Sequence, residues 1–332
     1  MRVLIVKLSS LGDVIQTLPV LHDIHEHVGA ARVDWVVEEA FAPLLAEVSG
    51  VERILPLAER RWRRRVFSVD TLRERRAFKA ELQRERYDAV IDFQGLIKSA
   101  LVARRARLAP GGHRYTYANR SEACGYEWPV RFMVDRALPM ERRVHAVRRY
   151  RLLAARALGY DFADALPRVH WHFRPQSSGR RDVMLAHGTT RSDNEWPEAA
   201  WAELGRRLVA AGHRVVLPQA GVAEAGRVAR LAAAIGAAGV DVLPPMPLDV
   251  LARRMAVCTG VIGVDSGLSH LAVALDLRHV QIFSQPRAWR AGPVGSAHQL
   301  AVGGDEAPTA DAVWAAWCEV RAARVASGDR SE

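Results

Sequence analysis

Short apolar runs alternate with segments of helical periodicity along most of the chain. Residues 2–8 contain an apolar run, 3–6, that predicts a buried strand, and residues 12–25 repeat apolar positions every three to four residues, as a helix does. Further strands are predicted at 33–38, 52–57 and 89–93, with helices at 71–86 and 96–107. Such alternation is typical of parallel sheets that are covered by helices.

The same pattern starts again after a join at residues 168–181, where Pro175, Ser177 and Gly179 indicate a linker. Strands are predicted at 182–186, 214–217, 240–243, 261–264 and 280–283, and helices at 198–211, 223–235, 248–257 and 268–275. We therefore predict an α/β protein with two doubly wound, Rossmann-like domains, residues 1–172 and 173–310. A lone helix follows at 311–326, and one interpretation is that it crosses back to the first domain.

Composition and charge narrow the choice of partners. The 332 residues are 49% hydrophobic, which is enough for two cores, and no run of about 18 apolar residues predicts a membrane span. The three cysteines lie far apart without metal or redox spacing, as expected in a reducing cytoplasm. A net charge of +10 points to an anionic partner, which could be nucleic acid, a membrane surface or a phosphorylated substrate.

The positive charge is concentrated in the N-terminal half, above all in a basic cluster of Arg60, Arg61 and Arg63. Trp62 and Phe67 lie among these arginines, and a bare solvated surface has no need of aromatic side chains. The cluster is therefore interpreted as an anion-binding or interfacial surface. The alternative is a solvated basic face that only aids solubility.

Asp13 lies where the first strand gives way to the first helix. In doubly wound folds, ligands bind beyond the carboxyl ends of the strands. A carboxylate at that place can accept the proton of an attacking hydroxyl group, and the alternative is that Asp13 caps the helix. The segment from Lys7 to Asp13 is neither a GxGxxG fingerprint nor a Walker loop, so neither a dinucleotide nor an ATPase is indicated.

A polar loop follows the first strand of the second domain. Its residues include Thr189, Thr190 and Arg191, and a diphosphate is bound by hydroxyl groups, backbone amides and a guanidinium of this kind. The alternative is an ordinary loop in which Ser192 or Asp193 forms the turn.

A third segment joins the end of a strand to the start of a helix. Asp265, Ser266 and Gly267 place small or polar groups where the helix dipole and free amides favour an anion, and His270 lies one turn further on. The alternative is a helix cap with a histidine that faces the core. Glu224 follows another strand end, where an acidic residue either holds ribose hydroxyls or is a first-turn carboxylate.

Taken together, these segments resemble glycosyltransferase family 9, the lipopolysaccharide heptosyltransferases. The similarity covers nearly the whole chain and includes residues 1–13, 34–39, 60–63, 87–100, 189–191 and 265–270. It points most narrowly to the members that add the first heptose. The resemblance implies a GT-B fold, in which two Rossmann-like domains face a central cleft.

The resemblance also implies the substrates and the site. The donor is ADP-L-glycero-D-manno-heptose, the acceptor is the Kdo of Kdo-lipid A, and the enzyme is cytoplasmic and peripheral on the inner-membrane surface. The reaction inverts the anomeric centre without a metal or cofactor, and Asp13 takes the position of the general base. The donor-binding positions are Thr189, Thr190, Arg191, Asn194, Glu224, Asp265, Ser266, Gly267 and His270. The acceptor-binding positions are Lys7, Ser9, Ser10, Gly12, Arg60, Arg61, Arg63, Gln94, Lys98 and Arg120.

A departure from the family pattern lies just before the Trp-Pro pair. Relatives commonly carry a lysine there that contacts the donor diphosphate, and this chain has Asn194. Arg191 or the helix amides would then supply the charge.

Three other functions remain open at this point. They are a family 9 enzyme that acts later in the core, an inactive donor-binding relative, and a basic nucleic-acid-binding Rossmann protein. Retention of Asp13 argues against the second. No nucleic-acid partner is expected, since no RNA- or DNA-binding motif is present.

Overall fold

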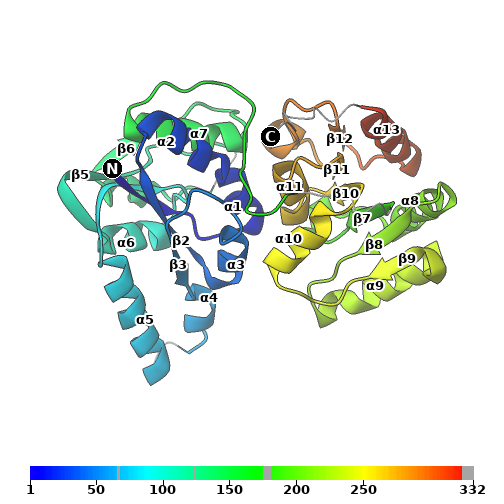
Figure 1. Ribbon diagram of the computed structural model, residues 1–332, viewed down its shortest axis with the longest axis horizontal. Helices are drawn as coiled ribbons and strands as arrows, with labels where there is room; N and C mark the ends of the chain where they lie inside the picture. Colours follow the sequence, from blue (N-terminus) through cyan, green and yellow to red (C-terminus); the bar gives the residue numbers. More distant parts are fainter. Residues whose placement is uncertain (66–67, 123–124, 175–180, 324–332) are drawn as a thin grey trace. The chain divides into compact units, whose positions relative to one another are not determined.

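The computed structural model describes residues 1–65, 68–122, 125–174 and 181–323, and in these ranges the chain forms two compact units, Met1–His172 and Phe173–Glu332. Each unit is a parallel sheet with helices on both faces (Figure 1). Within the described ranges, no helix combines the length and the apolar character that crossing a membrane requires.

The first sheet is doubly wound around its two central strands, β1 (Arg2–Val6) and β4 (Arg86–Asp92). Its strand order is β3-β2-β1-β4-β5-β6, and every neighbouring pair is parallel. The chain order reverses between β1 and β4, which makes this pair the switch point where such folds bind ligands. The outer strands are β2 (Arg32–Glu38), β3 (Arg53–Leu57), β5 (Arg107–Tyr117) and β6 (Arg136–Leu138).

Helices cover both faces of this sheet. One face carries α1 (Leu11–Thr17), α2 (Pro19–Val28) and α7 (Ala146–Leu158), which pack on one another (Figure 1). Leu4 and Val6 of β1 point to the other face, where they pack with Trp62 and with Val102. The elements there and in the connections are η1 (Glu39–Phe41), α3 (Ala42–Leu45), α4 (Glu59–Trp62), α5 (Val69–Leu82), α6 (Ile97–Arg105) and η2 (Trp128–Phe132).

The second sheet repeats this winding, with the order β12-β11-β10-β7-β8-β9 and parallel pairs throughout. Its switch point lies between β7 (Asp182–Ala186) and β10 (Gly260–Val264). A side chain at Gly263 would collide with Ser269 and Ala186, so glycine is required where the following helix and β7 approach β10. The other strands are β8 (Arg214–Leu217), β9 (Val240–Val242), β11 (His279–Phe283) and β12 (Gln299–Gly303).

The C-terminal helix packs on the second core. The described part of this segment, α13 (Ala310–Ala322), contacts α8, β11 and β12 of the second unit. The reason is its apolar face, since Val313, Trp317 and Val320 are fully buried in the second core. The other helices of this unit are η3 (Ser192–Asn194), α8 (Glu198–Ala210), α9 (Val222–Ile235), η4 (Ala237–Gly239), α10 (Leu248–Ala256), α11 (Gly267–Ala274) and α12 (Ala288–Ala291).

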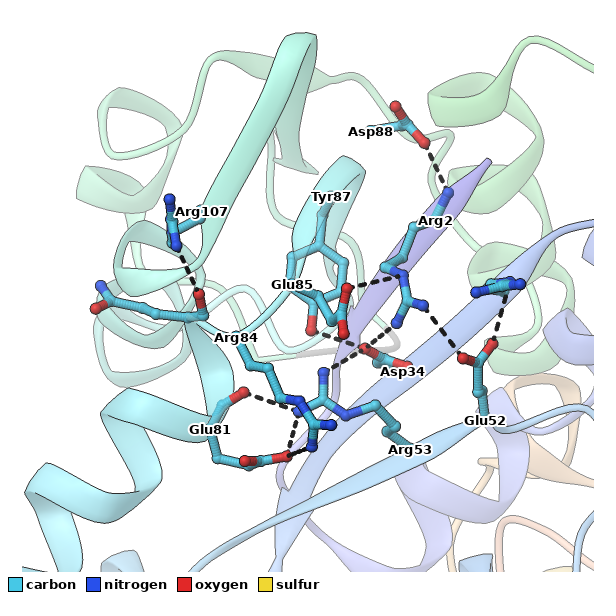
Figure 2. Close-up of polar contacts among 12 residues, drawn as sticks. Arg2, Asp34, Glu52, Arg53, Glu81, Arg84, Glu85, Tyr87, Asp88 and Arg107 are labelled. Carbon is cyan, nitrogen blue, oxygen red and sulfur yellow. Dashed lines mark hydrogen bonds and ion pairs between the residues drawn. The ribbon is translucent and has the colours of Figure 1, made fainter.

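The amino edge of the first sheet is closed by an ionic network (Figure 2). Asp34 of β2 is fully buried, and its carboxylate accepts bonds from Arg2 at 3.3 Å, Arg53 at 3.2 Å and the Tyr87 hydroxyl at 2.8 Å. These partners come from β1, β3 and β4, so the network ties four strands together. This network lies at the amino edge, and the candidate chemistry lies at the opposite, carboxyl edge.

Candidate functional site

Asp13 stands at the carboxyl edge of the first sheet, beside the switch point. Its Oδ2 accepts hydrogen bonds from the Ser10 backbone N–H at 3.0 Å and from the Ser10 hydroxyl at 2.8 Å. Its Oδ1 accepts a bond from the Tyr150 hydroxyl at 2.8 Å and lies 3.7 Å from the Lys7 amine. The side chain remains 31% exposed, so this carboxylate is both held in place and open to a ligand.

The surroundings keep Asp13 ionised. Burial acts to raise the pKa of Asp13, but the positive charge of Lys7 and the bonds from Ser10 and Tyr150 outweigh burial and lower this pKa well below its ordinary value. Asp92, at the end of β4, differs: burial raises its pKa to about 6, although Gln94, Ser99 and Gly95 donate hydrogen bonds to it. Of these two carboxylates, the exposed one is the stronger acid.

Two residues that the sequence places in acceptor binding make hydrogen bonds within the protein. The Lys7 amine is buried and donates to the Phe93 carbonyl and the Tyr150 hydroxyl, both at 3.1 Å, so it acts on Asp13 from within the protein. The Gln94 side-chain oxygen accepts from the backbone N–H groups of Leu8 and Ser9 at 3.2 and 3.1 Å. Gln94 therefore fixes the loop that leads to Asp13.

The other acceptor candidates lie in the same unit. Ser9 and Gly12 are half-buried beside Asp13, and Ser10 is exposed; Lys98 is half-buried on α6, and Arg120 is exposed after β5. Glu38 connects the basic cluster with the carboxyl edge of the first sheet. Its backbone N–H donates to the Leu8 carbonyl, and its carboxylate accepts from the Arg60 N–H. The structure thus brings Ser9, Ser10, Gly12 and Arg60 to the edge that carries Asp13.

The basic cluster is more strongly paired than the sequence suggests. Arg61 bonds two carboxylates, Glu39 and Glu74, and Arg63 pairs with Glu59. Trp62 is buried in the core and donates to Glu74 at 2.6 Å, so it does not form an interfacial surface. Phe67 lies outside the described residues. The expectation of exposed aromatics in this cluster is wrong for Trp62.

The carboxyl edge of the second sheet brings together four of the donor candidates. The Thr189 hydroxyl donates to the Asp265 carbonyl at 3.4 Å, and the Asn194 amide donates to the same carbonyl at 3.0 Å and to the Asp265 carboxylate at 3.2 Å. His270 lies 3.5 Å from that carboxylate. The loops after β7 and β10 therefore meet at the switch point, while Thr190 and Arg191 lie exposed beside it.

The remaining donor candidates surround this point. Ser266 is the N-cap of α11 and Gly267 is its first residue, so the helix amides begin here. Glu224 accepts from the Ala220 N–H at 2.8 Å. A side chain at Gly188 would lie 3.0 Å from the Glu224 carboxylate, which places Glu224 over the loop after β7.

Arg287 brings a positive charge to the position of Asn194. Its guanidinium donates to the Asn194 side-chain oxygen at 2.8 Å and to Asp193 at 2.5 Å. Burial acts to raise the pKa of Asp265, but His270, Arg290 and Arg287 together lower it. Arg191 is paired in a bidentate fashion with Asp193 and is 52% exposed, whereas Arg287 is 23% exposed.

Sequence reasoning missed two residues that complete these edges. Tyr150 was missed because no helix was predicted at 146–158, although Ala146, Tyr150 and Leu153 have helical spacing and Gly159 could end the helix. Arg287 lies in the loop after β11, and no local motif marks it.

The family follows from comparison with known proteins. The model of glycosyltransferase family 9 (heptosyltransferase) matches residues 75–313. The chain belongs to glycosyltransferase family 9. It is 42% identical over 294 residues to lipopolysaccharide heptosyltransferase 1 of Escherichia coli strain K12, covering 85% of this chain and 88% of that protein. It is 37% identical over 308 residues to the enzyme of the same name from Pseudomonas aeruginosa strain PAO1, covering 92% and 84%.

Solved structures agree with this assignment. The structure described as E. coli heptosyltransferase WaaC with ADP superposes with a TM-score of 0.84 at 37% identity, covering 97% of this chain and 100% of that one. E. coli ADP-heptose lipopolysaccharide heptosyltransferase II, at 20% identity and a TM-score of 0.77, shares the fold. The predicted α/β, GT-B fold class and the prediction of a glycosyltransferase of this family are confirmed.

Proposed function

We propose that this protein transfers L-glycero-D-manno-heptose from ADP-heptose to the Kdo of Kdo-lipid A, in lipopolysaccharide inner-core synthesis. The observation that carries the proposal is Asp13, an ionised and partly exposed carboxylate fixed at the switch point of the first unit. Family membership supports the class of reaction, and the relatives named for the first heptosyl transfer support the substrates.

Asp13 serves as the general base. The acceptor hydroxyl oxygen attacks the anomeric carbon of the heptose, the bond from that carbon to the diphosphate breaks, and ADP leaves with the bonding electrons. The hydroxyl proton passes to the Asp13 carboxylate, and attack from the face opposite ADP inverts the anomeric centre. A carboxylate of low pKa is a weak base, but it suffices because the hydroxyl becomes acidic as its oxygen bonds to carbon.

The carboxyl edge of the second sheet binds the ADP part of the donor. Thr189 and Thr190 provide hydroxyl groups, Ser266, Gly267 and His270 lie at the helix start, and Glu224 is placed to hold ribose hydroxyls.

Arg287 supplies the positive charge for the diphosphate at the position where relatives carry a lysine. Its bonds to Asn194 and Asp193 use two of the five N–H donors of a guanidinium, and the other donors can meet phosphate oxygens. Arg191 is the weaker candidate for binding the diphosphate. It is more exposed than Arg287, and its guanidinium already forms a bidentate pair with Asp193. No metal is required in this proposal, since arginine and helix amides neutralise the leaving ADP.

The acceptor is an anionic amphiphile, so basic side chains of the first unit are expected to contact its negative charges. Arg60, Arg63, Lys98 and Arg120 would contact its carboxylates and phosphates, together with Ser9, Ser10 and Gly12 near Asp13. Because the lipid stays in the inner membrane, the enzyme works as a peripheral protein on the cytoplasmic face.

A transfer assay tests the substrates. The purified protein should release ADP from ADP-heptose only when Kdo-lipid A is present, and the lipid should gain the mass of one heptose. Lipid A without Kdo and a UDP-linked sugar serve as controls. Equal transfer to an acceptor that already carries the first heptose would favour the alternative of an enzyme that acts later in the core.

A further inference from the structure

Exposed apolar side chains gather on η2 and α6 of the first unit. Trp128 and Phe132 lie one turn apart in η2, are 68% and 65% exposed, and touch edge to face at 6.1 Å between ring centroids. Ile97 and Leu101, one turn apart on α6, are exposed as well. Because η2 packs on α6 and the Ile97 N–H donates to Glu127 at 2.6 Å, these four side chains lie on adjoining elements and are here called the apolar patch.

Packing does not account for the two exposed rings. Val130 is the fully buried residue of η2 and anchors the turn, so Trp128 and Phe132 are not needed to hold it. Placing such large rings in water carries a free-energy cost, and contiguous exposed apolar surface marks a site of interaction.

Positive side chains accompany the patch. The Arg131 guanidinium lies 4.7 Å from the centre of the Phe132 ring, and Lys98 follows Ile97 in α6. Arg104 and Arg105, both exposed, end the same helix. Tryptophan and phenylalanine flanked by arginine and lysine are suited to the headgroup region of an anionic bilayer, where rings enter the interface and cations meet lipid phosphates.

The patch is connected to the edge that carries Asp13. The Glu127 N–H donates to the Gly95 carbonyl at 3.0 Å, and Gly95 directly follows Gln94, which holds the loop before Asp13. Arg120, an acceptor candidate, lies between β5 and η2 along the chain. A membrane that touches the patch would therefore adjoin the region where an acceptor headgroup is expected.

We infer that the apolar patch docks this enzyme on the anionic bilayer that holds its lipid acceptor. The inference rests on the proposed function for the nature of the acceptor. The aromatic anchor is Trp128 with Phe132, in place of Trp62, which is buried.

Vesicle binding tests the patch directly. The probes are phosphatidylcholine vesicles with and without phosphatidylglycerol, and the variant is Trp128→Ser combined with Phe132→Ser. Leu166→Ser is the matched control, because Leu166 is an exposed apolar side chain elsewhere in the first unit. The wild type should bind anionic vesicles in a salt-dependent way, and the double variant should bind at least about 10-fold more weakly, because buried apolar area sets interfacial affinity. Leu166→Ser should bind like the wild type, and all three should unfold at the same temperature.

Three results would overturn the inference. They are equal vesicle binding by the double variant, loss of binding only when Arg60, Arg61 and Arg63 are changed to alanine, and a wild-type dimer that the double variant dissociates. A soluble, deacylated Kdo acceptor separates docking from chemistry: the wild type and the double variant should use it at equal rates. No transfer to it by the wild type would defeat the proposed function, whereas vesicle binding would still decide whether the patch docks on membranes.

Discussion

The two carboxylate oxygens of Asp13 have different contacts. Oδ2 accepts the Ser10 N–H at the first turn of α1, as a helix-capping side chain does, while Oδ1 faces Tyr150 and Lys7. Capping and catalysis are therefore compatible interpretations of this residue. The cap fixes the side-chain conformation, and the opposite oxygen is held by a buried cation.

Tyr150→Phe should loosen the position of the Asp13 carboxylate without removing it. The change deletes one hydrogen bond that holds this charged group in place, worth about 1.5 kcal/mol, so turnover should fall about 10-fold. The pKa of Asp13 should rise, because the Tyr150 bond lowers it, and the ionised form would then be lost at a higher pH. The acid limb of the pH–rate profile should therefore move to higher pH. Tyr126→Phe, which removes a hydroxyl bonded to the Ala118 carbonyl, is the control and should leave that limb in place.

Arg287→Ala should weaken ADP binding by about 10-fold, the loss expected for one charge-assisted hydrogen bond to phosphate. Titration calorimetry in a buffer with EDTA measures this affinity and tests at the same time whether a metal is needed. Arg191→Ala should have the smaller effect, because Arg191 is already paired with Asp193.

A rescue variant separates the charge of Arg287 from its contacts with the loop. Adding Asn194→Lys to Arg287→Ala restores a cation where the two side chains meet, and should recover most of the ADP affinity. A stronger loss in Arg191→Ala than in Arg287→Ala would assign the diphosphate to Arg191. Loss of wild-type ADP binding in EDTA would show that a metal takes part.

At the scale of elements, the buried strands and the helices beside them were predictable. Continuous apolar runs indicate strands in the interior of a sheet, and apolar positions at helical spacing indicate the helices that cover it. β5 was missed because Pro110, Gly111 and Gly112 interrupt its strand signal. One predicted helix is two, α1 and α2, since Pro19 cannot continue the first. Contacts such as Tyr150 with Asp13, 137 residues apart, come from the packing of α7 and no local pattern contains them.

The start of β11 predicts how stability depends on pH. His279 is fully buried and bonded to the Val261 carbonyl, and burial lowers its pKa from 6.5 to about 4. The unfolded chain binds a proton between these values and the folded chain does not, so stability present above pH 6.5 is lost as the pH falls toward 4. The loss from this group is on the order of 3 kcal/mol.

Urea unfolding at several pH values measures this loss. His279→Gln, which can keep the bond to Val261, should unfold with a shallower pH dependence than the wild type between pH 6.5 and 4. Some pH dependence of the free energy of unfolding should remain in this variant. The pKa values of His187 and His213 are also lowered, in both cases mainly by burial. An unchanged slope would show that His279 does not titrate on unfolding.

At the scale of the whole molecule, the chain uses one topology twice. Both sheets reverse their winding between their central strands, and in both units the candidate residues follow those strands. Segments that follow strand ends can therefore be singled out from the amino-acid sequence alone. The partners that complete the two edges, Tyr150 and Arg287, lie outside those segments, and only the fold brings them there.

The central claim is that Asp13 transfers the acceptor proton during heptosyl transfer from ADP-heptose to Kdo-lipid A. The most direct measurement is the steady-state rate of ADP release by the wild type and by Asp13→Asn, with ADP affinity measured in parallel. General-base catalysis contributes about 10²–10⁴-fold, so turnover should fall by that factor while ADP affinity stays the same. Near-normal turnover by Asp13→Asn would contradict the account and leave Asp13 only as a helix cap.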